Sequence, residues 1–142
     1  MIPTKIILHH SATKDSGSVS WNAIRRFHVE QNKWEDIGYH AGVELVTDAA
    51  GISHYEMLLG RTWDRTGAHT KGQNSQALGL CFVGDFDIKE PPKDQLLAGA
   101  KIVRMWMDLY NIPVHMIFGH RDFAQKSCPG RMFNIGNFKD LL

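Results

Sequence analysis

Three residues with chemically useful side chains lie within nine positions near the end of the chain: His120, Lys126 and Cys128. An apolar run at 114–118 comes shortly before them and predicts a buried strand that delivers the histidine at its C-terminal end. An imidazole and a thiolate at this separation are suitable ligands for zinc. Two ligands do not make a site, so a third must come from elsewhere. An apolar run near the start of the chain leads into two adjacent candidates, His9 and His10.

The segments that must position these residues alternate between strand and helix patterns. Strands are predicted at 5–9, 41–47, 52–57, 78–83 and 114–118, and helices at 20–32 and 94–110. Residues 48–51 are typical of a hairpin turn, and the polar segment 60–76 is expected to be a loop that lines a groove. Val19 is expected to pack against Ile24 at the start of the first helix. The alternation predicts an α/β fold: a single domain over residues 1–142, with a central mixed β-sheet flanked by helices.

The composition excludes several classes of protein. Hydrophobic residues make up 43% of the 142 residues and charged residues 22%, as in an ordinary globular domain. The formal net charge of +1 gives no support for binding to nucleic acid or to an anionic membrane surface. Two cysteines do not make a disulfide framework. The first residues lack a signal-peptide pattern, and no apolar run approaches the length of a membrane span, so we expect accumulation in the cytoplasm.

Short motifs follow one another in a fixed order over most of the chain. They are HHSAT at 9–13, WEDIGYH at 34–40, GAHTKG at 67–72, LGLCFVGDF at 78–86, GHRD at 119–122 and CPG at 128–130. Each motif alone is weakly specific, whereas the ordered set is highly specific. Together they resemble the zinc-dependent N-acetylmuramoyl-L-alanine amidases of the phage-lysozyme type, which are related to the peptidoglycan recognition proteins. The resemblance implies hydrolysis of the bond between N-acetylmuramic acid and L-alanine in peptidoglycan.

The resemblance also implies roles for individual residues. The metal ligands would be His9, His120 and Cys128, which hold one Zn²⁺ per chain. Three protein ligands leave the fourth position open for water, whose pKa falls to about 7 in such sites. The resemblance makes Tyr39 and Lys126 the catalytic side chains. The lysine would stabilise a developing oxyanion, and the tyrosine would orient the water or relay a proton. The identity of the general base stays open.

Four further residues match positions that hold substrate in the family: His69, Asn74, Arg61 and Trp63. Arg61 would offer a planar fork for a peptide carboxylate, and Trp63 a flat face for sugar or peptide. The alternative for all four is a place in an ordered surface loop without contact to substrate.

Other candidate residues have simpler interpretations. Strand alternation turns His10 to the face opposite its neighbour, so we expect it to be structural. His40 is adjacent to a candidate catalytic residue, and a packing role and a catalytic role both stay open. Cys81 lies in the middle of a strand and is interpreted as a small buried hydrophobe. The segment 28–30 spells the first half of a zinc deaminase signature, but the Pro-Cys-x-x-Cys half is missing. Core or structural positions are expected for His54, Met105, Trp106, Met107 and His115.

The most direct functional interpretation is a phage or prophage endolysin that reaches the cell wall after release from the cytoplasm. Its partner would be peptidoglycan or a muropeptide, with neither nucleic acid nor membrane involved, and the protein would act as a monomer. One alternative is a peptidoglycan-binding domain without activity. In such relatives the ligand cysteine is typically replaced, often by serine, so Cys128 favours an enzyme. The other alternative is a regulatory protein, because some phage amidases of this family also bind the phage RNA polymerase.

Overall fold

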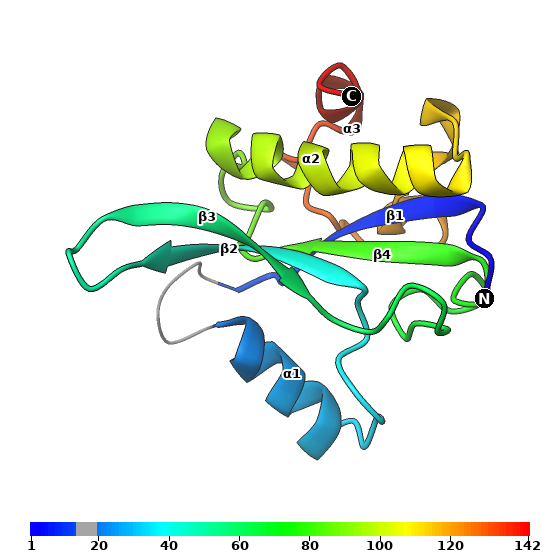
Figure 1. Ribbon diagram of the computed structural model, residues 1–142, viewed down its shortest axis with the longest axis horizontal. Helices are drawn as coiled ribbons and strands as arrows, with labels where there is room; N and C mark the ends of the chain where they lie inside the picture. Colours follow the sequence, from blue (N-terminus) through cyan, green and yellow to red (C-terminus); the bar gives the residue numbers. More distant parts are fainter. Residues whose placement is uncertain (14–19) are drawn as a thin grey trace.

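Five strands form one mixed sheet in the computed structural model, which describes residues 1–13 and 20–142 (Figure 1). In spatial order they are β3 (Ser53–Leu59), β2 (Ala41–Thr47), β4 (Ala77–Phe82), β1 (Lys5–His10) and β5 (Ile117–Gly119). The β2–β3 pair is antiparallel, and every other neighbouring pair is parallel. The predicted central mixed sheet is therefore confirmed. Val19 lies outside the described residues, so its contact with Ile24 stays a prediction.

Helices cover both faces of the sheet (Figure 1). The long helix α2 (Lys93–Tyr110) and the short α3 (Ile135–Lys139) lie over one face, and α1 (Trp21–Glu30) lies over the other. Side chains alternate along β1, so Ile6 and Leu8 join the core beneath α2. His9 consequently points to the face that α1 covers. None of the helices in the described ranges combines the length and the apolar character that a membrane span requires.

The face that α2 turns toward the sheet differs in part from the prediction. Trp106 is fully buried as expected, but Met105 is 45% exposed and Leu97, which begins the apolar pattern, is 37% exposed. The sheet contact is made instead by a stripe that includes Gly99, because a Cβ atom there would lie only 2.4 Å from the ring of Phe82. The expectation that Met105 lies in the core was wrong: it is displaced from this stripe around the helix, while Trp106 lies on it.

The apolar run at 114–118 does not form one buried strand. Its first part is a 3₁₀ turn, η1 (Val114–Met116), and Val114 is 43% exposed. The strand begins only at Ile117: β5 (Ile117–Gly119) pairs with β1, and η2 (His120–Asp122) follows directly. The turn forms because the amide of Met116 donates to the carbonyl of Pro113. The predicted strand was thus too long, although a strand does deliver His120 from its C-terminal end.

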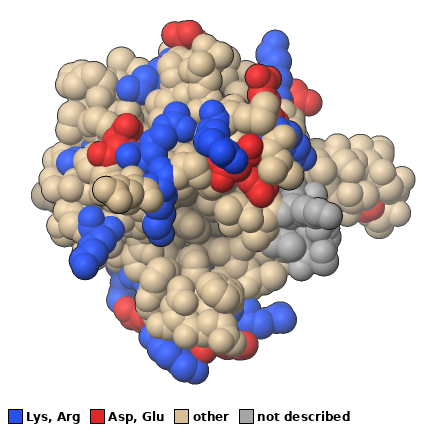
Figure 2. Space-filling model, turned by 180° about the vertical axis from the view of Figure 1, so that it is seen from behind, with Lys and Arg blue, Asp and Glu red and all other residues tan. Residues whose placement is uncertain are grey.

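Charged side chains of both signs are interspersed on the face of the molecule shown in Figure 2. Lys and Arg surround a hollow on this face, and Asp and Glu lie among them. This mixed distribution agrees with the formal net charge of +1.

Candidate active site

Two neighbouring strands and one loop bring together His9, His120 and Cys128. Because β1 and β5 are parallel, their C-terminal ends lie at the same edge of the sheet, where His9 is the second-last residue of β1 and His120 directly follows β5. One ligand atom from each of the three residues lies within 4.8 Å of the others. His9 is 1% exposed, whereas the other two side chains are half-buried. The three predicted metal ligands therefore converge in space.

The chemistry and spacing of this cluster fit a zinc ion. Two imidazole nitrogens and a thiol are donors that zinc prefers. A tetrahedral zinc ion with ordinary bond lengths separates a nitrogen ligand from a sulfur ligand by about 3.6 Å. The Nδ1 atom of His9 and the Sγ atom of Cys128 are 3.6 Å apart. The cluster also lines a cavity of about 460 Å³, so a fourth position can be reached from outside.

The loop that carries Cys128 is fixed by contacts on both sides of the cysteine. The Asp87 carboxylate accepts from the Ser127 hydroxyl at 2.8 Å and from the Arg131 amide at 2.9 Å. The amide of Arg121 donates to the carbonyl of Cys128 itself at 2.7 Å. These bonds, first to Arg131 and then to Ser127, hold the pKa of the Asp87 carboxyl below its usual value. The thiol position is therefore set by the surrounding loop.

Burial and a nearby cation determine the protonation of the cluster. Burial raises the pKa of Cys128 to about 11, and Lys126 opposes this rise. Desolvation lowers the pKa of His120, and the lysine charge lowers it further. Desolvation also lowers the pKa of His9 well below its usual value. Both histidines are therefore neutral near pH 7, as metal binding requires, and the thiol would release its proton to solvent when a metal ion binds.

Both predicted catalytic side chains line the same cavity. The ring centroid of Tyr39 lies 5.2 Å from that of His9. Burial raises the pKa of Tyr39 well above 10, as does its hydrogen bond with Cys81, so the phenol keeps its proton. The Lys126 side chain is exposed at the rim of the cavity. The arrangement places one neutral hydroxyl and one cation beside the candidate ligands.

His40 and His10 hold backbone groups in place. The Nδ1 atom of His40 accepts from the amide of Gly79 at 3.0 Å, and its Nε2–H donates to the carbonyl of Arg65 at 2.9 Å. With both ring nitrogens engaged and the side chain fully buried, His40 has a packing role. His10 accepts from the amide of Phe86 at 3.1 Å, although its side chain also borders the cavity. Cys81 is fully buried, as expected.

Of the four predicted substrate residues, only His69 lines the cavity. It lies beside a candidate ligand, since its Nδ1 atom is 3.0 Å from Nε2 of His9. Burial lowers the pKa of His69 to about 3, so the ring is neutral. Asn74 is placed differently: its Oδ1 atom accepts from the amides of His69 and Thr70 at 2.9 and 2.8 Å. Asn74 therefore shapes the turn that carries the histidine.

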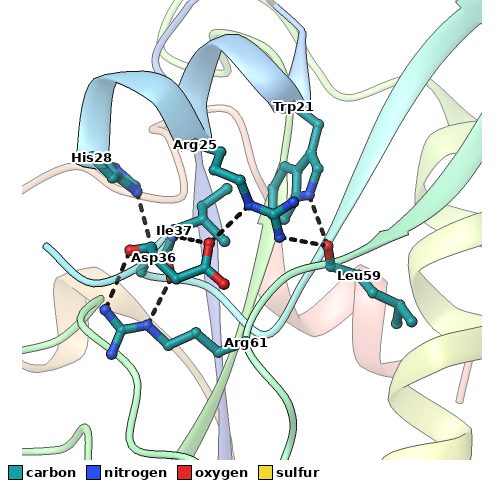
Figure 3. Close-up of polar contacts among 8 residues, drawn as sticks. Trp21, Arg25, His28, Asp36, Ile37, Leu59 and Arg61 are labelled. Atoms are coloured by element: carbon teal, nitrogen blue, oxygen red, sulfur yellow. Dashed lines mark hydrogen bonds and ion pairs between the residues drawn. The ribbon is translucent and has the colours of Figure 1, made fainter. Parts of the chain in front are cut away.

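The structure does not bring Arg61 and Trp63 into the cavity. The Arg61 guanidinium donates to the backbone carbonyls of Ile37 at 2.8 Å and Asp36 at 3.3 Å (Figure 3). It also donates to the Thr66 carbonyl at 2.8 Å. Trp63 packs edge-to-face on Trp106, with ring centroids 5.8 Å apart, and borders a separate hollow of about 380 Å³. The amides of Gly60 and Arg61 donate to the carbonyls of His40 and Tyr39, so the chain after β3 runs alongside the residues that precede β2.

Figure 3 shows that Arg61 belongs to a polar network that fastens α1 to the segment leading into Tyr39. Arg25 pairs with the Asp36 carboxylate at 2.8 Å, and the indole of Trp21 donates to the Leu59 carbonyl at 3.0 Å. This network connects the helix, the hairpin end and one wall of the cavity.

Arg61→Ala is expected to lower the free energy of unfolding by about 2 kcal/mol, because three carbonyls lose a charged donor that is partly shielded from water. Urea unfolding followed by circular dichroism measures the change. Arg65→Ala is the matched control, since its ion pair with Glu35 is solvent-exposed and should contribute less than about 1 kcal/mol. Equal effects of the two substitutions would contradict the role of Arg61 in this network.

Among the residues that line the cavity, His28 and Trp34 contribute aromatic rings to its wall and were not predicted site residues. Their rings lie 4.7 Å apart, and Nδ1 of His28 accepts from the amide of Gly38 at 3.0 Å. Its neutral ring therefore carries the remaining proton on Nε2. The spacing of His28 seven residues after the buried Trp21 was the available signal, because it places both on one face of α1.

Comparisons with known proteins agree with this geometry. The family described as N-acetylmuramoyl-L-alanine amidase matches residues 1–131. The endolysin of Enterobacteria phage K11 is 34% identical over 131 residues, which cover 89% of this chain and 80% of that protein. The amidase LysC from Clostridium intestinale superposes with a TM-score of 0.82 at 27% identity, covering 98% of this chain and 84% of that one. A Drosophila PGRP-LB mutant in complex with tracheal cytotoxin gives a TM-score of 0.75 at 26% identity, with 94% and 79% covered.

The family match extends from the first strand to the loop after Cys128 and so includes all three candidate metal ligands. The fold, the order of the motifs and the convergent His, His and Cys side chains agree with one another. The chain belongs to the N-acetylmuramoyl-L-alanine amidase family.

Proposed function

We propose that the protein is a zinc hydrolase that cleaves the amide bond between N-acetylmuramic acid and L-alanine in peptidoglycan. The observation that carries the proposal is the cluster of His9, His120 and Cys128 at a cavity, in a chain of this amidase family. With three protein ligands, zinc supplies a Lewis acid and an open position where water is acidified. A binding domain without activity is less well supported, because the cysteine is present and its sulfur lies close enough to the two histidines for all three to hold one ion.

The chain's own side chains would do the rest. Lys126 would place a cation at the cavity rim, where it stabilises the negative charge that develops on the carbonyl oxygen of the scissile amide. Tyr39 would donate a hydrogen bond from its protonated hydroxyl and so orient the attacking water or the leaving amine. His28, His69 and Trp34 would form the remaining polar and aromatic walls. With substrate bound, these wall residues would keep bulk solvent out of the cavity and leave room for the attacking water.

Relatives support the substrate class. One structural neighbour is the endolysin amidase LysCS of Clostridium intestinale, and another holds tracheal cytotoxin. We therefore propose a muropeptide as the ligand of the cavity and lysis of the cell wall as the purpose of the reaction. A monomeric enzyme, stored in the cytoplasm and released to the wall, agrees with this role. The geometry of the described residues offers no specific support for binding to RNA polymerase.

The proposal is tested by incubating the purified protein with defined muropeptides and weighing the products by mass spectrometry. Free stem peptide that begins with L-alanine is expected. A chelator should abolish the product, and added zinc should restore it. The reason is that the metal would activate the water and polarise the scissile carbonyl. Magnesium at the same concentration is the matched control and should not restore activity, since His and Cys ligands suit it poorly. Intact muropeptide in the presence of bound zinc would contradict the proposal.

A further inference from the structure

The imidazole of His69 occupies a slot that two glycines keep open. A Cβ atom at Gly79 would lie 2.6 Å from the His69 ring, and a Cβ atom at Gly67 would also lie 2.6 Å from it. Real Cβ atoms do not approach other atoms so closely, so any larger residue at these positions would displace the ring. The His69 side chain is itself only 9% exposed. The ring is therefore fixed in one orientation by its surroundings.

A backbone carbonyl determines which nitrogen of this ring carries the proton. Nε2 of His69 lies 3.1 Å from the carbonyl oxygen of Ala77. A carbonyl oxygen only accepts hydrogen bonds, so the His69 proton is on Nε2. Nδ1 of the neutral ring then presents a lone pair. That lone pair faces Nε2 of His9 at 3.0 Å.

The tautomer of His69 in turn determines the tautomer of His9. Two lone pairs facing one another at 3.0 Å would repel, so Nε2 of His9 carries a proton and donates it to His69. The other nitrogen of His9, Nδ1, is then unprotonated. It is this atom that lies 3.6 Å from Sγ of Cys128. The free lone pair of His9 thus points into the candidate metal cluster.

We propose that His69 is a positioning residue, which holds His9 in the tautomer whose Nδ1 atom is free to bind the metal. The inference rests on the zinc site of the proposed function and adds a device that prepares it. Metal-binding histidines usually donate their second N–H to a carboxylate, a carbonyl or water. Here the acceptor is a second imidazole, which the carbonyl of Ala77 orients in turn.

The hydroxyl of Thr70 is the competing partner. It lies 3.1 Å from Nδ1 of His69 and 3.3 Å from Nε2 of His9. If it donated to His9, that nitrogen would have no proton, and the two imidazole lone pairs would face one another. The hydroxyl instead donates to His69 or accepts from His9, and both arrangements leave the His9 proton on Nε2. Thr70 accordingly assists the His9–His69 contact and does not set its direction.

Two measurements test the proposal in the wild type and in the variants His69→Phe, His69→Asn and Thr70→Val. The first is the tautomer of His9 in the metal-free protein, from ¹⁵N chemical shifts, with the resonance identified through a His9→Gln variant. The second is zinc affinity at fixed pH, by competition with a chromophoric chelator. Phenylalanine fills the slot without an acceptor, whereas the Oδ1 atom of asparagine restores an acceptor near the place of Nδ1. Valine removes only the neighbouring hydroxyl.

The wild type should show the Nε2–H tautomer at His9. His69→Phe should show a mixture of tautomers and bind zinc about 10- to 100-fold more weakly. His69→Asn should recover most of the affinity, and Thr70→Val should stay within about threefold of the wild type with the tautomer unchanged. If His69→Phe does not fold, the proposal is still tested by the His9 tautomer in the wild type and by the zinc affinities of His69→Asn and Thr70→Val.

An Nδ1–H tautomer at His9 in the wild type would overturn the proposal. So would a loss of zinc affinity of about 10-fold or more in Thr70→Val, because it would assign the role to the hydroxyl. The tautomer measurement needs neither metal nor substrate. A protein with the expected tautomer and zinc affinity that leaves muropeptides intact would therefore disprove the proposed function and leave this inference standing.

Discussion

Cys128→Ser is expected to remove zinc from the protein and to reduce muropeptide hydrolysis to the background rate. Serine has nearly the shape of cysteine, but its hydroxyl stays protonated near neutral pH and does not replace a thiolate ligand. The fold should survive, since the loop is held by Asp87 and by the backbone bond from Arg121 to residue 128, which do not involve the thiol. Metal content by mass spectrometry, product analysis and the thermal midpoint measure the three effects.

The second thiol provides the control for this experiment. Cys81→Ala should keep one zinc per chain, because Cys81 is fully buried in β4 and is not part of the His9, His120 and Cys128 cluster. Its stability should fall by about 1 kcal/mol, as is usual for a small loss of packing in a core. A Cys128→Ser protein that retains both zinc and full turnover would refute the assignment of the metal ligands.

Lys126→Ala should lower kcat by roughly 100- to 1000-fold while zinc stays bound. The loss is of the size found when one donor to a developing oxyanion is removed. The lysine is exposed at the rim of the cavity, and its side chain has no hydrogen bond or ion pair with the residues that the structure describes, so the thermal midpoint should change little. Single-turnover rates with a defined muropeptide, together with zinc content, separate catalysis from metal binding.

Charge and position are distinguished by two further variants. Lys126→Arg retains the cation and should restore part of the rate, whereas Lys89→Ala removes an exposed cation that does not line the cavity and should leave the rate unchanged. Equal rates for Lys126→Ala and the wild type would exclude the lysine from the mechanism.

Sequence patterns predicted the central part of this architecture because it depends on local signals. The motifs around His9 and His120 end two strands, and the parallel pairing of β1 with β5 brings strand ends to one edge. The extent of β5 was not predictable from apolar residues alone, because the 3₁₀ turn before it is fixed by a backbone hydrogen bond. Sequence patterns also misplaced Met105, since the contact face of α2 depends on where Gly99 meets Phe82.

The roles of loop residues depend on contacts between distant segments. The sequence left the role of His40 open. The structure shows that its two ring nitrogens bond the backbone groups of residues 65 and 79. The guanidinium of Arg61 meets carbonyls that come from two separate segments, so its direction cannot be derived from residue type or spacing. In the same way, the contact between His9 and His69 appears only when residues sixty positions apart are folded together.

Because Arg61 bonds only backbone carbonyls in this network, the sequence around it can vary more than the structure. The arginine binds the carbonyls of residues 36, 37 and 66, and Arg25 and Trp21 bind that of residue 59. Side chains at exposed acceptor positions such as Leu59 and Thr66 are therefore free to vary without loss of these bonds. Selection or directed evolution can therefore change the surface side chains here, while the backbone hydrogen bonds that position the segment with Tyr39 are kept.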